Sequence, residues 1–394
     1  MPPETIVPRA AREPLVVAAI ACGLAGLYGW AAFVLSFSHD GLIGPRYNAP
    51  GIDFMVFWRA ARAALAGDLA ILSDGARFTA ALNREFAHWL SAPLPLHPWV
   101  YPPHFLLLLL PFGLLPFGAA YALFVVATFA LAAAAVLAGE RGFRRALLGG
   151  ALALSPAAAI TATAGQNSFL AAALLVGGCR LAATRPALGG ALLGVLTVKP
   201  QLFLMVPVAL LAARQGRALA ACVAAALSLV AASVALFGLA PWQAWLDAML
   251  DPANELHRGW TELSLRWGES VYTDATLLGA APLAAAAAQG VAILAAAIAV
   301  VRVRANAPQS LMVLLAATVL AAPHVAAYDT VLLGIAAGLF LARALERGLR
   351  PMDLPLALAL WLVPLYGAPI TSPLGFATPL VVLAFLGRMM VQPP

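Results

Sequence analysis

The sequence predicts an all-α protein that crosses a membrane many times. Of its 394 residues, 63% are hydrophobic and 10% are charged, whereas soluble domains contain about 25% charged residues. The mean hydropathy is +0.91. Long apolar runs alternate with short polar loops that contain most of the arginines. Because backbone polar groups inside a bilayer must be hydrogen-bonded within the chain, we expect these runs to be helices.

About twelve apolar runs are candidates for membrane crossings. A helix needs about 20 residues to cross roughly 30 Å of hydrocarbon, and shorter runs are typical of tilted or broken helices. The first run exceeds the core of a signal peptide and lacks a convincing cleavage site, so we expect it to remain as a helix. The expected crossings are residues 15–36, 117–138, 146–164, 167–183, 187–198, 201–213, 218–239, 277–301, 309–323, 327–345, 354–370 and 373–391.

The basic residues predict how these crossings are oriented. If the runs cross alternately, 15 of the 22 arginines lie on one face with five acids, and that face carries +10. The opposite face has seven arginines, twelve acids and Lys199, the only lysine, and it carries −4. Excess arginine in short loops marks the cytoplasmic side. We therefore expect a multi-pass protein of a bacterial inner membrane, with both termini cytoplasmic and the active face toward the periplasm or exterior.

Two long segments lie on the predicted outer face, residues 37–116 and 240–276. They contain seven of the nine tryptophans, which fits either an aromatic belt at the headgroups or a surface that stacks on sugar rings. Residues 104–115 form an apolar run that is too short to cross the membrane. Counting this run as a crossing would place the arginines at 141–145 on the outer face. We expect an interfacial or re-entrant helix there, and one integral membrane domain over 1–394.

Composition also excludes some classes of function. Cys22, Cys179 and Cys222 lie inside apolar runs, so they are expected to be packing residues and give neither a disulfide framework nor metal-ligand spacing. The isoelectric point is near 9.6, but the arginines are scattered between apolar runs and form no single basic patch. We predict no nucleic-acid partner, no metal ligands and no cofactor. Anionic lipid headgroups are the expected partners of the arginines.

Asp53 precedes a short amphipathic helix in the first outer segment. Apolar side chains at 54, 57, 58, 61 and 65 share one helical face, and Gly67 is suited to end the helix. Such a helix is expected to lie along the membrane surface. Asp53 is expected at its N-cap, where a carboxylate accepts backbone N–H bonds. A carboxylate at this depth could also take a proton from an incoming hydroxyl group.

Lys199 lies between two apolar runs that are each short for a crossing. A lysine at helix-centre depth costs roughly 2.5–3.5 kcal/mol on insertion scales, so it is expected to have a partner or a water-filled cavity. It could instead extend to the outer interface. As a compact cation it would suit a phosphate oxygen.

His324 follows Pro323 at the predicted outer end of a short helix, with Tyr328 and Asp329 close behind it. Such a histidine could be a hydrogen-bonded packing residue. The turn at 165–168, which contains Gln166 and Asn167, and the proline-rich stretch at 101–104, which contains Tyr101 and His104, are expected at the same face. Both also have purely structural interpretations.

Asp53, Lys199 and His324 are distant in sequence but share one predicted depth. An acid, a cation and an imidazole around an outward cavity fit transfer of a group from a lipid phosphate to a hydroxyl acceptor. No glycine loop that would cradle a nucleotide phosphate lies on that face.

These motifs, taken in order, resemble glycosyltransferase family 87. The similarity is carried by Asp53-Phe54 through Phe57-Trp58-Arg59-Ala60-Ala61 with Gly67-Asp68, then Tyr101-Pro102-Pro103, Gly165-Gln166-Asn167, Lys199-Pro200, and Pro323-His324 through Tyr328-Asp329. The members that it resembles are polyprenyl-phosphate-mannose-dependent mannosyltransferases of the GT-C superfamily.

The resemblance implies a GT-C-type glycosyltransferase fold, a polyprenyl monophosphate sugar donor, a lipid or glycan acceptor, and inversion at the anomeric carbon. It implies that Asp53 is the general base and that Lys199 and His324 face the donor phosphate. Asp53 is followed by Phe54 where many GT-C enzymes have a second acid, which speaks against a paired-carboxylate metal site. The remaining residues expected around the substrate are Arg59, Tyr101, His104, Gln166, Asn167, Gln201, Tyr328 and Asp329.

Two other classes of function would also need polar residues in broken helices. A lipid-linked sugar flippase or secondary transporter is the main alternative, although transporters often contain internal repeats and none is convincing here. A catalytically silent assembly subunit is the other.

Overall fold

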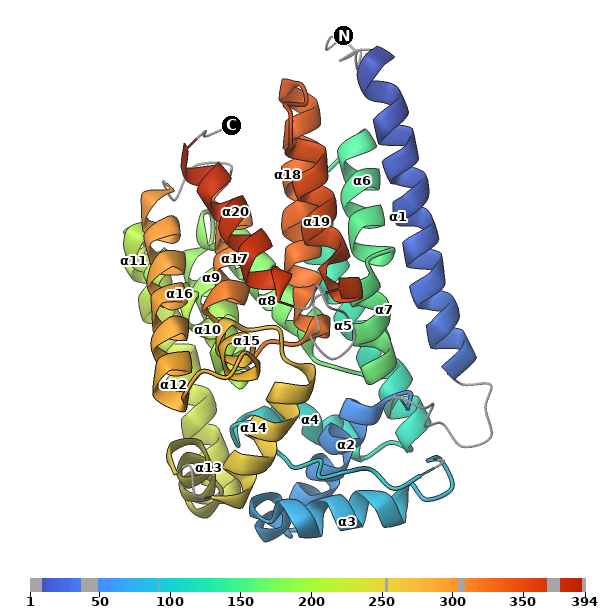
Figure 1. The fold of residues 1–394 in the computed structure, drawn as a ribbon. Coiled ribbons are helices and arrows are strands. Elements are labelled where there is room, and N and C mark those ends of the chain that lie inside the picture. The colour runs from blue at the N-terminus through green and yellow to red at the C-terminus, as the bar shows by residue number, and fades with distance from the viewer. Residues whose placement is uncertain are drawn as a thin grey trace.

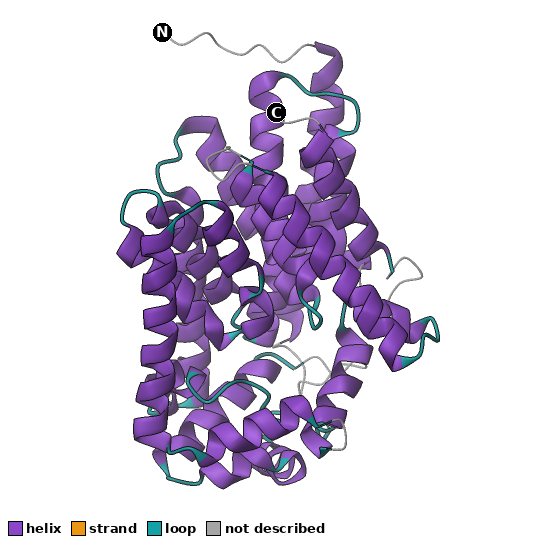
Figure 2. Cartoon of the chain, turned by 90° about the vertical axis from the view of Figure 1, so that its left-hand side faces the viewer, coloured by secondary structure: helices purple, strands orange, loops and turns teal. Residues whose placement is uncertain are grey.

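The computed structural model describes residues 9–36, 49–90, 92–251, 254–303, 309–366 and 376–391. Within these ranges the chain is helical and forms no strand (Figure 2). One isolated β-bridge within them joins Gly268 to Ala326. The all-α prediction is therefore confirmed for the described residues.

Most helices form an elongated bundle (Figure 1). Within it, α12 packs against α9, α5 against α8, and α18 against α19. The bundle helices are α1 (Arg9–Ser36), α5 (Phe117–Leu137), α6 (Gly142–Ala153), α7 (Pro156–Ala164), α8 (Ser168–Ala182), α9 (Pro186–Val195), η2 (Leu196–Val198), α10 (Pro200–Phe203), α11 (Met205–Ala212), α12 (Gly216–Phe237), α15 (Val271–Leu277), α16 (Pro282–Arg302), α17 (Ser310–Ala321), η3 (Ala327–Thr330), α18 (Val331–Arg347), α19 (Asp353–Tyr366) and α20 (Ala377–Val391).

The described helices of the two predicted outer segments, apart from α15, form a layer across one end of the bundle, opposite the start of α1 and the end of α20 (Figure 1). This layer has its own hydrophobic core, which includes Phe54, Phe57, Phe78 and Leu106. Its helices are α2 (Ile52–Leu65), η1 (Leu69–Ser73), α3 (Gly75–Glu85), α4 (Phe105–Gly113), α13 (Ala240–Leu250) and α14 (Glu255–Trp267).

Each of the twelve expected crossings contains at least one helix. Four described helical segments are long and apolar enough to cross a membrane, namely 117–137, 216–237, 282–302 and 327–347, and the pair α6–α7 adds a fifth that is bent by 48°. The other apolar helices are shorter. The chain is thus a multi-pass membrane protein, and twelve crossings remain a prediction.

Ion pairs join loops that the arginine pattern assigned to one face. Glu140 contacts Arg144 at 2.5 Å and Arg180 at 2.9 Å, and Arg144 also contacts Glu346 at 2.9 Å. Asp353, at the start of α19, similarly binds Arg347 of α18 and Arg388 of α20. The structure therefore brings these loops together at the end of the bundle away from the outer layer.

The start of α2 differs from the prediction. The N-cap is Gly51, at φ 73°, and Asp53 lies inside the first turn. Gly51 N–H donates to Thr163 O at 2.6 Å, so α7 fixes the earlier start and leaves the Asp53 carboxylate available. Gly67, at φ 74°, follows the end of the helix as expected.

α2 is also buried more completely than a helix on a membrane surface. Val56, Ala60 and Ala63, outside the predicted apolar face, are buried as well, because α4 and η1 pack against the helix. Trp58 and Trp99 are 5% exposed and belong to the core of the layer. These two tryptophans therefore form neither a headgroup belt nor an open surface for sugars.

Small residues set the position of Lys199. A Cβ atom at Gly190 or Gly194 would collide with backbone oxygens of Ala218 and Cys222, so glycine lets α9 lie directly against α12, as in membrane helix pairs. After α9 the backbone continues as η2, and Lys199 occupies the break before α10. The predicted interruption at Lys199 is confirmed.

Candidate active site

Asp53 is held at the junction of the outer layer and the bundle. Its Oδ2 accepts a hydrogen bond from Gln166 Nε2 at 3.0 Å. On the other side, His97 Nε2 lies 3.4 Å from Asp53 Oδ1. The Asp53 side chain is 19% exposed. The carboxylate therefore has a neighbour at each oxygen and is still open to an approaching molecule.

Gln166 connects Asp53 to the bundle. It follows Gly165, which is at φ 70° and where a Cβ atom would collide with Phe54, so glycine allows the turn to approach α2. Gln166 Oε1 accepts from the Tyr101 hydroxyl at 2.9 Å and from its neighbour's N–H at 2.8 Å. The Tyr328 hydroxyl also interacts with this side chain. One amide thus joins α2, the 99–103 segment and η3.

Lys199 has a buried partner, as an intramembrane lysine requires. Its Nζ forms an ion pair with Asp329 Oδ1, lies 3.3 Å from Ser168 Oγ, and sits 5.0 Å from the centre of the Tyr328 ring. Ser168 Oγ donates to Asp329 Oδ1 at 2.6 Å. Lys199 is 1% exposed. The alternative in which Lys199 extends to the interface is therefore wrong.

The two groups of contacts form one polar cluster, which we call the Gln166 cluster; it comprises Asp53, Tyr101, Gln166, Ser168, Lys199, Tyr328 and Asp329. Burial raises the pKa of the Tyr101 hydroxyl well above its ordinary value, and the charges of Asp53 and Asp329 act in the same direction. Gln166 and Tyr328 thus connect Asp53 to the Lys199–Asp329 pair. The expected role of His324 beside them stays a prediction.

His324 lies further along the loop that leads to the cluster. Its ring centre is 6.2 Å from that of Tyr272. Burial lowers the pKa of the imidazole to about 4, and the charge of His257 acts in the same direction, so His324 is neutral near pH 7. The second outer segment fixes this loop, since Glu269 N–H donates to Val325 O at 2.8 Å and Ser270 Oγ donates to Pro323 O at 2.7 Å.

Other predicted residues lie at the edges of the cluster or outside it. Arg59 Nε is 3.5 Å from Glu85 Oε2, so Arg59 forms an ion pair within the outer layer. His104 stacks on Trp242 and its Nε2 lies 3.2 Å from Thr197 Oγ1, near Lys199. Burial lowers the pKa of His104 to about 4. Gln201 is partly exposed at the start of α10.

Asn167 is 1% exposed. Its side-chain Nδ2 and Oδ1 have no hydrogen-bond partner among the described residues. Buried polar groups are almost always hydrogen-bonded. A polar ligand that binds next to Gln166 would therefore supply the hydrogen bonds that the Asn167 amide lacks.

Comparison with known families now gives the chain its class. The model of glycosyltransferase family 87 matches residues 99–323, which is more than half of the chain. The chain belongs to glycosyltransferase family 87. It is accordingly a membrane glycosyltransferase. No curated protein and no solved structure matches it.

The family 87 match includes Tyr101, Gln166 and Lys199 and ends one residue before His324, while Asp53 precedes it. Two acidic or basic residues near the cluster were not predicted from the sequence. His97 contacts Asp53, and Glu269 is 1% exposed beside the 323–326 loop. The only local signals were the prolines around His97 and the glycine before Glu269.

Glu269 gives this glycosyltransferase a predicted dependence of stability on pH. Burial raises the pKa of its carboxyl group from 4.5 to about 8, with Asp274 and Asp329 adding to the shift and a hydrogen bond from Thr378 opposing it. The folded state therefore holds a proton that the unfolded state releases above pH 4.5. Stability is expected to be full below pH 4.5 and to fall as pH rises through about 8.

The measurement is the thermal denaturation midpoint of the purified protein at pH 5 and pH 8.5. Glu269→Gln, which mimics the protonated acid, should lose less stability across this range than the wild type. Glu262→Gln is the matched control, because Glu262 is an exposed acid of the same outer segment, and it should lose as much stability as the wild type. Asp274→Asn cannot serve as the control, because burial also raises the pKa of Asp274, to about 7. A Glu269→Gln protein with the full wild-type loss would show that Glu269 does not cause it.

Proposed function

We propose that this protein transfers a hexose, with mannose as the expected sugar, from a polyprenyl monophosphate donor to a hydroxyl acceptor on the outer face of a bacterial inner membrane. The acceptor would be a lipid or a glycan. The observation that carries the proposal is the single polar cluster in which Gln166 connects the carboxylate of Asp53 to the Lys199–Asp329 pair. The periplasmic orientation and cytoplasmic termini follow from the arginine distribution.

In the proposed reaction, the acceptor oxygen attacks the anomeric carbon from the side opposite the polyprenyl phosphate. The new C–O bond forms as the bond to the phosphate oxygen breaks, and the phosphate leaves with the electron pair. Asp53 takes the acceptor's proton, a contribution that is typically about 10² to 10⁴-fold. The configuration at the anomeric carbon is inverted.

Lys199 would stabilise the charge that develops on the leaving phosphate, since fixed cations at such positions are often the largest catalytic contribution. Its ammonium has three donors, and contacts Asp329 and Ser168 in the free protein. These two contacts use two of the donors, so the third would be available to the donor phosphate. Neutral His324 would add a hydrogen-bond donor rather than a charge. The unpartnered Asn167 amide is suited to a sugar hydroxyl.

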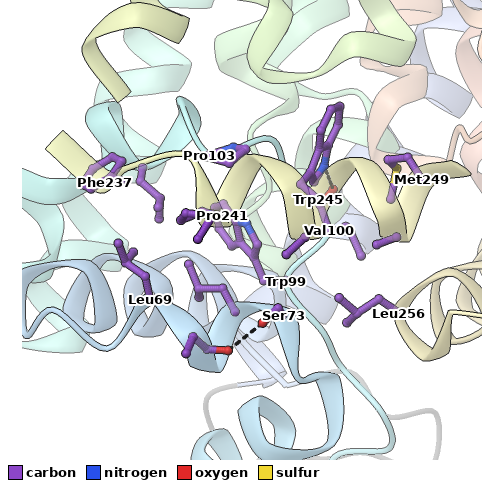
Figure 3. Close-up of a pocket in the computed structure, with 16 residues that line it drawn as sticks. Leu69, Ser73, Trp99, Val100, Pro103, Phe237, Pro241, Trp245, Met249 and Leu256 are labelled. Atoms are coloured by element: carbon purple, nitrogen blue, oxygen red, sulfur yellow. Dashed lines mark hydrogen bonds between the residues drawn. The ribbon is translucent and has the colours of Figure 1, made fainter. Parts of the chain in front are cut away.

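An apolar cavity of about 370 Å³ supports a lipid donor (Figure 3). Such volumes are typical of small-molecule sites. Trp99, Val100 and Pro103 form one wall, and α13 contributes Trp245, whose Nε1 donates to Val100 O at 3.2 Å. Tyr101, between these wall residues, contacts Gln166 instead. The 99–103 segment thus borders both the cavity and the polar cluster, and we propose that isoprene units next to the phosphate occupy the cavity.

The test is glycosyl transfer by the purified protein in lipid vesicles, with an alkyl glycoside as acceptor. Polyprenyl-phosphate mannose should yield a glycoside of inverted configuration together with one free polyprenyl phosphate per product. A nucleotide sugar should yield none, and a donor truncated to one isoprene unit should have a raised KM. Product from the nucleotide sugar, or movement of the lipid-linked sugar across the membrane without a new glycosidic bond, would contradict the proposal.

A further inference from the structure

His97 is the second side chain that lies next to the Asp53 carboxylate. Its Nε2 lies 3.4 Å from Asp53 Oδ1, while Gln166 binds Oδ2, so each carboxylate oxygen has one neighbour. The His97 side chain is 15% exposed and the Asp53 side chain 19%. The pair is therefore partly screened from solvent but is not sealed from it.

The outer layer holds His97 in place through its backbone. His97 N–H donates to Thr79 Oγ1 at 2.9 Å, and that hydroxyl donates to Gly75 O at 2.7 Å. Asn83, one turn further along α3, donates from Nδ2 to Leu94 O at 3.0 Å and accepts from Leu94 N–H at 2.7 Å. Three hydrogen bonds thus attach residues 94–97 to α3, and the histidine ring is presented to α2 from a rigid support.

We propose that His97 is a positioning residue for the transfer reaction: its neutral ring holds the Asp53 carboxylate toward the acceptor hydroxyl, and protonation of the ring withdraws Asp53 from proton transfer. This inference rests on the proposed role of Asp53 as base. A neutral imidazole that donates from Nε2 fixes the carboxylate without reducing its charge. A charged imidazolium stabilises the ionised carboxylate and so makes it a weaker base.

Asp53 is the charged neighbour of the His97 ring. Among the described residues, Asp53 of α2 is the ionisable group within ion-pair distance of the ring. Tyr101, on the other side of Gln166, remains uncharged at neutral pH because its pKa is well above the ordinary value. From α3 the contact is the Thr79 hydroxyl, which does not titrate. An imidazole can be neutral or positively charged, so the contact with Asp53 has two electrostatic forms, which a pH profile of activity can distinguish.

The experiment measures kcat and donor KM from pH 5 to 8.5 for the wild type, His97→Ala and His97→Gln. We expect His97→Ala to lower kcat by up to about 10²-fold with KM unchanged, because misplacement of a catalytic group by about 1 Å has that effect. Glutamine keeps an N–H donor but cannot be charged. His97→Gln should recover most of the activity at pH 8 and should lose less of it toward pH 5 than the wild type.

Two further variants separate the possible outcomes. His88→Gln, an exposed histidine of the same segment, should match the wild type. Wild-type kcat in His97→Ala, beside an inactive Asp53→Asn, would overturn the role of His97 and leave the proposed function standing. Full activity in both would overturn the base role as well. If His97→Ala does not purify as a folded protein, His97→Gln decides alone: a wild-type pH profile contradicts the inference, and a flattened profile supports it.

Discussion

Replacing Asp53 with asparagine is expected to lower kcat by about 10² to 10⁴-fold, the range typical for loss of a general base. Asparagine is nearly the same size and its Oδ1 can still accept the hydrogen bond from Gln166. The substitution therefore removes the proton acceptor and keeps the contact with Gln166, while the amide nitrogen replaces the carboxylate oxygen that faces His97. The measurement is transfer from polyprenyl-phosphate mannose under saturating donor, with donor KM determined separately.

The matched control is Asp68→Asn, because Asp68 is an acid of the same outer layer, 3.6 Å from Arg77 and about 40% exposed at its side chain. It should keep wild-type kcat. Undiminished turnover in Asp53→Asn would remove Asp53 from the base role. A raised KM with unchanged kcat would assign Asp53 to substrate binding, because such a pattern marks interactions made equally in the ground and transition states.

The position of Asp53 illustrates what the sequence could predict and what it could not. The spacing of apolar residues predicted α2, and Gly67 predicted where the helix stops, because both features depend on neighbouring residues in the sequence. The helix start was wrong by two residues, since it depends on a bond from Gly51 to Thr163, more than a hundred residues away. The same tertiary contact turned an expected capping residue into a carboxylate that faces Gln166.

The prediction that Lys199 has a partner followed from the cost of an intramembrane charge, which needs no structural information. Which residue is the partner could not be predicted. Asp329 is 130 residues away, and its position depends on how the 323–326 loop is attached to Glu269 and Ser270. His97 was missed for a related reason, because hydrogen bonds to α3, rather than local periodicity, bring it to Asp53.

The buried Lys199–Asp329 pair gives the second large expected effect. Lys199→Met leaves the Asp329 carboxylate buried without its counter-charge, and removal of one partner of a buried ion pair typically costs about 3–5 kcal/mol. The variant should therefore unfold at a clearly lower temperature and should also lose glycosyl transfer. Loss of activity by this variant alone would not separate a structural lysine from one that binds the donor phosphate.

The double variant Lys199→Met with Asp329→Asn separates them. Asparagine can still accept the hydrogen bond from Ser168 and carries no charge, so most of the lost stability should return. The stability of the double variant then reports the structural contribution of Lys199, and its activity reports the catalytic contribution, by the logic of a double-mutant cycle. If Lys199 neutralises the leaving phosphate, the double variant is stable and inactive. A double variant that is both stable and active would restrict Lys199 to balancing Asp329, and the charge on the phosphate would have to be met elsewhere.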